Sequence, residues 1–593
     1  MASRSSSLHF HRRLYSTFNQ WSVRQVRKSD FHGCLGDLDG HISASDFIAL
    51  SLQKTGSSSF PWHRLQPFDT SHTAYCKAKY AAEKFQILQF ALCPFSVRES
   101  KLIAHPYNFH LFPRDELNIG MPSYSFSCQV SHLTSMAREG FDFDACIYDG
   151  ISYLSRAQES IAKVRMGCPT PTTSTYVLKS SSRQSIADSV FIQRVKSRVK
   201  NWKDACNSST KTNAKGGGTQ AIRAILTSSK DDKILLEKEL QNLEEEENKR
   251  FRGFREVIDM ISASQKPIVS YGSLNGVYLI YSLLLVGLLV FFLFLLLSSF
   301  SSNAFLLHAD FTFIHSKFLA PLPPRIDEFS DSLHSVFPQV LDVQHLMRNI
   351  SGLNKPTSIS SALSYLKNHY FAPVDLDIPV EGTGNERKFH GHNAIKLCHL
   401  FTKVCSVLKI DLSGVQFNEK PLASNLEGCA NVFASFPPCN QEPEDEGEDV
   451  KISTRNVRKV SCGQLVFLWG FRDGMTAGLL KAALQGSHEV LCEEFDVRFV
   501  GKKCAILVFW QPGLSETFLD AIHSDGILGS LKDMVSEGLR AASYETYKRV
   551  CRLGHWEADL AESLERATSE ADCETARLDI YYSNNSLINL NDL

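Results

Sequence analysis

Ser51 and Gln53 lie near the end of a short, mostly apolar run. Their polar side chains could bind a ligand or take part in a reaction. The run, Ser45–Gly56 (SDFIALSLQKTG), is apolar at five positions and closes at a Thr-Gly pair, which predicts a buried central strand. Residues two apart on a strand share a face, so Ser51 and Gln53 project to the same side. Both side chains are neutral, so this face presents a hydroxyl and an amide.

This strand requires a sheet and helices to position it. The next strands are predicted at residues 85–92 (FQILQFAL) and 102–112, and helices are predicted over 336–350 and 358–369. Several strands this early in the chain need helices packed over them, which predicts an α/β fold.

Three stretches together resemble one known family. SDFIALSLQKTG resembles the first strand of the poly(A)-specific ribonuclease (PARN) family, and AEKFQILQFALCPF and YNFHLFPRDEL resemble its second and third strands. The resemblance implies a ribonuclease-H-like (DEDD exonuclease) mixed sheet with helices. It also implies a Mg²⁺-dependent 3′–5′ exoribonuclease that shortens poly(A) tails, with RNA as partner.

The same resemblance implies four metal-binding acids, and this chain departs from that pattern. The matching positions hold Ser51, Gln53, Asp310 and Asn393, of which only Asp310 is an acid and a metal ligand. Mg²⁺ prefers charged oxygen ligands, so we expect weak metal binding and weak or absent nuclease activity. The family's general-base histidine corresponds to His390 or His392, and the sequence leaves that choice open. An ordinary surface histidine is the alternative for either.

Two regions carry residue types that bind RNA. Arg194, Lys196 and Arg198 lie on a predicted basic helix that would follow phosphates, although a solvated helix face is an equal alternative.

The order strand 465–470, helix 475–484, strands 495–500 and 504–510, helix 516–523 resembles an RNA-recognition-motif (RRM) fold. On an open sheet face, Phe467, Trp469 and Trp510 would stack on bases; the alternative is that they belong to the core.

An apolar segment interrupts the resemblance. Residues 276–297 read GVYLIYSLLLVGLLVFFLFLLL, and no Asp, Glu, Lys or Arg occurs between Pro267 and Asp310. Hydropathy predicts a transmembrane helix at 277–297. A retained intron covering 276–309 is the interpretation that we favour, because a single crossing would divide one sheet domain between two sides of a membrane.

The first residues and the overall composition bear on location. Residues 1–28 contain six Arg or Lys and no acid, which is typical of a mitochondrial, or alternatively plastid, transit peptide.

The formal net charge of −1 argues neither for nor against RNA binding. Sixteen cysteines without a CxxC pair indicate reduced thiols and no zinc module.

Taken together, the sequence predicts an RNA-binding member of this family with an impaired nuclease site. An active organellar deadenylase and a single-pass membrane-anchored RNA-binding protein are the alternatives. A homodimer, or pairing with an active homologue, is the expected assembly. The predicted boundaries are a transit peptide at 1–30, nuclease-domain parts at 31–160, 251–275 and 310–410, a basic helical insertion at 161–250, the apolar insert at 276–309, an acidic linker at 411–462, an RRM-like and helical domain at 463–571, and a disordered tail at 572–593.

Overall fold

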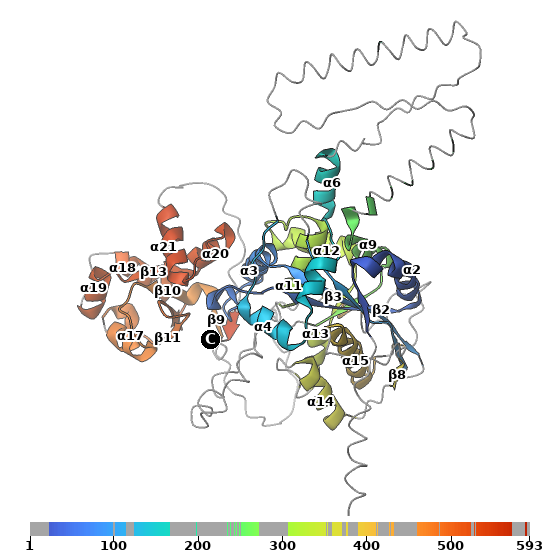
Figure 1. Ribbon diagram of the computed structural model, residues 1–593. Coiled ribbons are helices and arrows are strands. Elements are labelled where there is room, and N and C mark those ends of the chain that lie inside the picture. Colours follow the sequence, from blue (N-terminus) through green and yellow to red (C-terminus); the bar gives the residue numbers. More distant parts are fainter. Residues whose placement is uncertain are drawn as a thin grey trace, which may run out of the picture.

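The computed structural model describes residues 23–98, 101–113, 124–165, 251–271, 306–350, 358–370, 390–410 and 459–571, apart from a few positions within them, and some shorter stretches elsewhere. Two larger sheets organise these residues (Figure 1), and β9 (Lys459–Ser461) and β14 (Leu587–Asn589) form a separate two-stranded pair. The first belongs to the N-terminal domain, and the second lies in the C-terminal domain, coloured orange to red in Figure 1.

The first sheet is mixed and contains the predicted early strands. Its main path runs β1-β5-β3-β2-β6-β7, with β2 antiparallel to β3 and parallel to β6. The strands are β1 (Arg24–Val26), β2 (Phe47–Lys54), β3 (Ile87–Arg98), β4 (Lys101–Ala104), β5 (Tyr107–His110), β6 (Ile268–Ser270), β7 (Val340–Asp342) and β8 (Asp375–Asp377). This arrangement confirms the α/β, ribonuclease-H-like fold class.

Two local predictions in this sheet are wrong. The single strand predicted at 102–112 is two strands, β4 and β5, separated at Pro106, which has no backbone N–H to continue a ladder. The helix predicted over 336–350 is interrupted by β7, which pairs with β6.

Helices cover both faces of the first sheet. They are α2 (Lys28–Ala44), α3 (Ser71–Lys84), α4 (Val130–Arg138), α5 (Phe143–Asp149), α6 (Arg156–Arg165), α9 (Arg255–Ser264), α11 (Leu306–Ile314), α12 (Ile326–Val336), α13 (Val343–Met347), α14 (Ile359–His369) and α15 (Gly391–Val407). On one face of β2, Ile48, Leu50 and Leu52 pack into a core with α2, α9 and α11, whereas Phe47 and Ala49 pack towards α15. Ser51 and Gln53 continue the α15 face, as strand alternation predicts.

The segments on either side of the apolar insert belong to this one domain. β6 precedes the insert and pairs with β7, which follows it. α11 begins at Leu306, before the predicted end of the insert at 309, and buries Phe311 and Phe313 in the same core as Ile268 of β6. Within the described ranges, no helix is both long and apolar enough to cross a membrane. The predicted span at 277–297 lies outside those ranges.

The N-terminal boundary differs from the prediction. Arg24, Arg27 and Lys28 were counted in the basic leader, but Arg24 lies in β1 and Lys28 opens α2. Arg24 and Arg27 pair with Asp37 and Asp142, so these cations have structural partners. Residues 1–22 lie outside the described ranges, and the transit peptide stays a prediction. The cysteines of the described part are free thiols, as expected.

The second sheet is antiparallel with order β11-β12-β10-β13. Its elements follow the predicted β-α-β-β-α order and continue with further helices. They are β10 (Leu465–Trp469), α17 (Ala477–Leu484), β11 (Phe495–Phe499), β12 (Cys504–Phe509), α18 (Leu514–His523), α19 (Gly529–Ser536), β13 (Arg540–Ser543), α20 (Tyr544–Leu553) and α21 (Leu560–Ala571). Membership of the RRM family stays a prediction.

Candidate functional site

The end of β2 and the start of α15 bring three of the predicted site residues together. Nε2 of His390 lies 3.2 Å from Oγ of Ser51, and Nδ1 of His390 lies 3.3 Å from Nδ2 of Asn393. Gly391 permits this approach, because a Cβ there would stand 2.4 Å from Cγ1 of Val23. Of the two histidines left open by the sequence, His390 is the one whose ring contacts Ser51 and Asn393.

The orientation of Asn393 decides where the proton of His390 sits. In this arrangement the Asn393 amide donates to Nδ1, so a neutral ring carries its proton on Nε2 and donates it to Ser51. His390 is buried, and burial lowers its pKa to about 4, against the opposing effect of nearby Asp310. A neutral ring with its proton on Nε2 has no free acceptor nitrogen facing β2.

Asp310 joins this site from α11, and it has an ion-pair partner. Its carboxylate contacts the ammonium group of Lys54, and the two side chains are only 19% and 14% exposed. The Lys54 ammonium also lies 4.9 Å from the ring centre of Phe313. The charges of Asp310 and Lys54 both reach His390, where Asp310 raises and Lys54 lowers the pKa. Asp310 is therefore near enough to act electrostatically on His390, but this one acid among the four family positions is already paired with a cation.

A second carboxylate lies at the edge of the site. Nε2 of Gln53 donates to Oε2 of Glu139 at 3.2 Å, and Oε1 of Glu139 accepts from Ser135 at 3.3 Å. Glu139 follows α4, far from β2 in the sequence, so strand spacing gave no signal for it. Lys54 was likewise missed, although it stands next to Gln53.

The side chains at the four family positions do not fit as ligands for a pair of divalent metal ions. Ser51 offers a hydroxyl, Gln53 and Asn393 offer amides, and Asp310 is held by an ammonium group. Metal pairs that hydrolyse phosphodiesters need several charged oxygens to hold them about 4 Å apart. Throughout the described residues, no three His, Cys, Asp or Glu side chains are grouped as a metal site.

The aromatic residues predicted to stack on RNA are not on an open face. Phe467 and Trp469 are 0% and 5% exposed, so the prediction of an open stacking surface is wrong for them. Strand alternation does place both on one face, but α20, α21 and a segment of the N-terminal domain that includes Phe68 cover it. Trp510 packs against the same cluster and is partly buried. Arg194, Lys196 and Arg198 lie outside the described residues.

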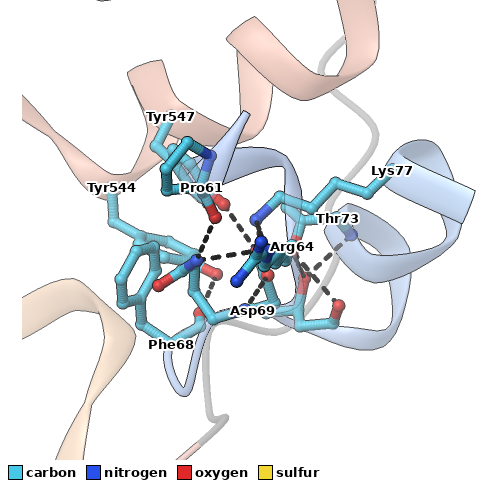
Figure 2. Close-up of polar contacts among 10 residues, drawn as sticks. Pro61, Arg64, Phe68, Asp69, Thr73, Lys77, Tyr544 and Tyr547 are labelled. Atoms are coloured by element: carbon cyan, nitrogen blue, oxygen red, sulfur yellow. Dashed lines mark hydrogen bonds and ion pairs between the residues drawn. The ribbon is translucent and has the colours of Figure 1, made fainter. Parts of the chain in front are cut away.

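The segment that closes this face joins the two domains. Phe68 lies edge-on to Phe467 with ring centres 5.6 Å apart, and its carbonyl accepts from Tyr544 at 2.6 Å. Asp69, next in the chain, pairs with Lys77 at 2.7 Å and accepts from Tyr547 at 2.5 Å. Figure 2 shows Asp69 between Lys77 of α3 and Tyr547 of α20. We call Phe68, Asp69, Lys77, Tyr544 and Tyr547 the junction cluster.

Comparison with known proteins places this chain in a ribonuclease family. The family profile described as "CAF1 family ribonuclease" matches residues 26–288 and 303–399, which is more than half of the chain. The "Poly(A)-specific ribonuclease PARN-like" protein of Arabidopsis thaliana is 46% identical, with 97% of each chain covered. The "Poly(A)-specific ribonuclease PARN" of the same plant is 25% identical, over 93% of this chain and 90% of that one.

A solved structure was matched as well. The structure of S. pombe Pop2p in its "Mg2+ and Mn2+ bound form" is 10% identical and covers 65% of this chain and 94% of its own, with a TM-score of 0.32. That score is too low to support any argument about the present site.

Proposed function

Because this chain belongs to the CAF1 ribonuclease family and within it to the poly(A)-specific ribonucleases, we propose that it binds the 3′ ends of adenylate-rich RNA with little or no hydrolysis. One observation carries the proposal. The four family positions, on β2, α11 and α15, hold one carboxylate, Asp310, and that carboxylate is paired with Lys54.

The remaining groups of the site suit binding better than bond cleavage. Nε2–H of His390, the hydroxyl of Ser51 and the ammonium of Lys54 are hydrogen-bond donors that phosphate oxygens and ribose hydroxyls accept. A general base at this place would need a free Nε2 lone pair. Asn393 instead holds the ring in the tautomer that carries its proton on Nε2, much as an Asp-to-Asn change does in a Ser-His-Asp triad.

The binding half of this proposal predicts an affinity for RNA that does not depend on metal. We expect the dissociation constant for a fluorescent 3′-oligo(A) RNA, measured by anisotropy, to be the same within about twofold in Mg²⁺ and in EDTA, since no metal bridges protein and phosphate. An oligo(U) of equal length is the control for adenylate preference. Loss of oligo(A) binding in EDTA at constant ionic strength would contradict the proposal.

An active deadenylase is the second candidate, and Glu139 is the observation that favours it. Its carboxylate reaches the β2 end through Gln53 and adds a second acid to Asp310. We favour the binding function because both acids, Asp310 and Glu139, have engaged partners and the other three family positions are neutral. Release of AMP separates the two candidates.

We also propose that the apolar segment is an insertion, of the kind a retained intron produces, and not a membrane span. Two observations support this. β6 and β7, on either side of it, pair in one sheet, and the family match breaks off at residue 288 and resumes at 303. A single crossing would place β6 and β7 on opposite sides of a bilayer.

Deleting residues 276–305 tests this proposal and leaves α11 intact. We expect the shortened chain to be soluble and to unfold in one cooperative transition per domain, because β6 and β7, on either side of the segment, pair directly with each other. Urea unfolding followed by circular dichroism provides the measurement. A full-length chain that resists alkaline extraction from membranes, together with a deletion variant that stays insoluble, would establish the span instead.

A further inference from the structure

Lys54 and Asp310 form a partly buried ion pair between β2 and α11, 256 positions apart in the chain. Neither side chain is more than one-fifth exposed, and the ammonium group also faces the ring of Phe313. Charges removed from water in this way are costly unless they are paired, so each one holds the other in place.

The local shape of β2 accounts for the position of Lys54. The register between β2 and β3 shifts between Gln53 and Lys54, where Gln53 pairs with Gln89 and Lys54 pairs with Ile87. A bulge of this kind re-aims a side chain at the end of a strand and is common beside functional sites. Lys54 therefore follows the site residue Gln53 directly and reaches the acid on α11.

The charge of Lys54 also affects the pKa values of two nearby histidines. It contributes to lowering the pKa of His390 and of His132, after the larger effect of burial in both cases. The positive charge therefore lies close to the position where the family resemblance expects cations. A divalent ion placed on Asp310 would have to displace the ammonium group and would be repelled by it.

We infer that Lys54 is a built-in counter-ion that takes the place of a divalent cation at Asp310 and closes the site to metal. The inference rests on the proposed function, which places Asp310 in the site, and it goes one step further. Restoring the missing acids is not enough to bind metal while Lys54 remains.

Mn²⁺ binding to the full-length protein, followed by electron paramagnetic resonance of the free ion, tests this directly. One variant carries Ser51→Asp, Gln53→Glu and Asn393→Asp, and a second adds Lys54→Met. We expect the second variant to bind Mn²⁺ at least about a hundredfold more tightly, because a unit positive charge beside the ion has been removed. Lys54→Arg in place of Lys54→Met is the matched control, and it should bind as weakly as the first variant.

Equal Mn²⁺ affinity with and without Lys54 would overturn the inference and leave the proposed function standing. Tight Mn²⁺ binding by the unmodified chain would overturn the proposed function itself. Thermal unfolding of each variant checks folding, and Lys54→Gln replaces Lys54→Met if the latter does not fold. The Mn²⁺ affinities to compare are then those of the three-acid variant with Lys54 and of the same variant with Lys54→Gln.

Discussion

A chain carrying Ser51→Asp, Gln53→Glu, Asn393→Asp and Lys54→Met is expected to release AMP from 3′-oligo(A) RNA about a thousandfold faster than the unmodified chain. The three acids supply the charged oxygens that a metal pair requires, and the loss of Lys54 frees Asp310. A carboxylate at 393 also accepts a hydrogen bond from Nδ1–H of His390, which leaves Nε2 unprotonated towards β2. Release of AMP in Mg²⁺ or Mn²⁺, resolved by chromatography, is the measurement.

The substitutions should act as a unit. Each acid introduced alone is expected to yield almost no activity, because residues that share one mechanism are strongly non-additive. Asp310→Asn in the fully substituted chain is the matched control, and we expect it to abolish AMP release while leaving the fold intact. If the substituted chain binds Mn²⁺ tightly and still leaves RNA whole, then the end of β2 is not the catalytic strand.

The second large effect concerns the junction cluster. Replacing Asp69 by Asn is expected to lower the free energy of unfolding by about 3–5 kcal/mol, because it leaves the Lys77 ammonium buried without an anion. The side chains of Asp69 and Lys77 are 0% and 4% exposed, so solvent screens this pair very little. Asp69 also accepts from Tyr547 and Thr73. Urea unfolding at constant m gives the change.

Two further variants separate the ion pair from its surroundings. Tyr547→Phe removes one hydrogen bond to Asp69 and should cost about 1–2 kcal/mol. The double variant Asp69→Asn with Lys77→Met should be more stable than Asp69→Asn alone, because the unpaired charge is gone. A double variant that is less stable than the single one would mean that the junction depends on packing and not on the buried charges.

The sequence predicted the site wherever a local rule applied. Alternation along β2 placed Ser51 and Gln53 on one face, and the structure has Ser51 in contact with His390 at the start of α15. The histidine could not be chosen from spacing, because His390 and His392 flank Gly391 and the approach of α15 to the sheet decides between them. The ion pair of Asp310 with Lys54 could not be predicted from the sequence, because 256 positions separate the two residues.

The C-terminal domain shows the same limit. The strand pattern put Phe467 and Trp469 on a common face, which is correct, but the pattern contains nothing about what covers that face. The cover comes from α20, α21 and the segment around Phe68, which belongs to the other domain. β7 was missed because a three-residue strand between helices leaves no periodicity to detect.

The most direct test of the account is AMP release by the unmodified full-length chain, with 3′-oligo(A) RNA in saturating Mg²⁺ or Mn²⁺. The account predicts bound RNA that keeps its length, at a rate indistinguishable from that of the Asp310→Asn variant. Rapid, metal-dependent shortening that Asp310→Asn abolishes would contradict it. If Glu139→Gln abolished the shortening as well, the site would be a working nuclease that recruits its second acid from the end of α4.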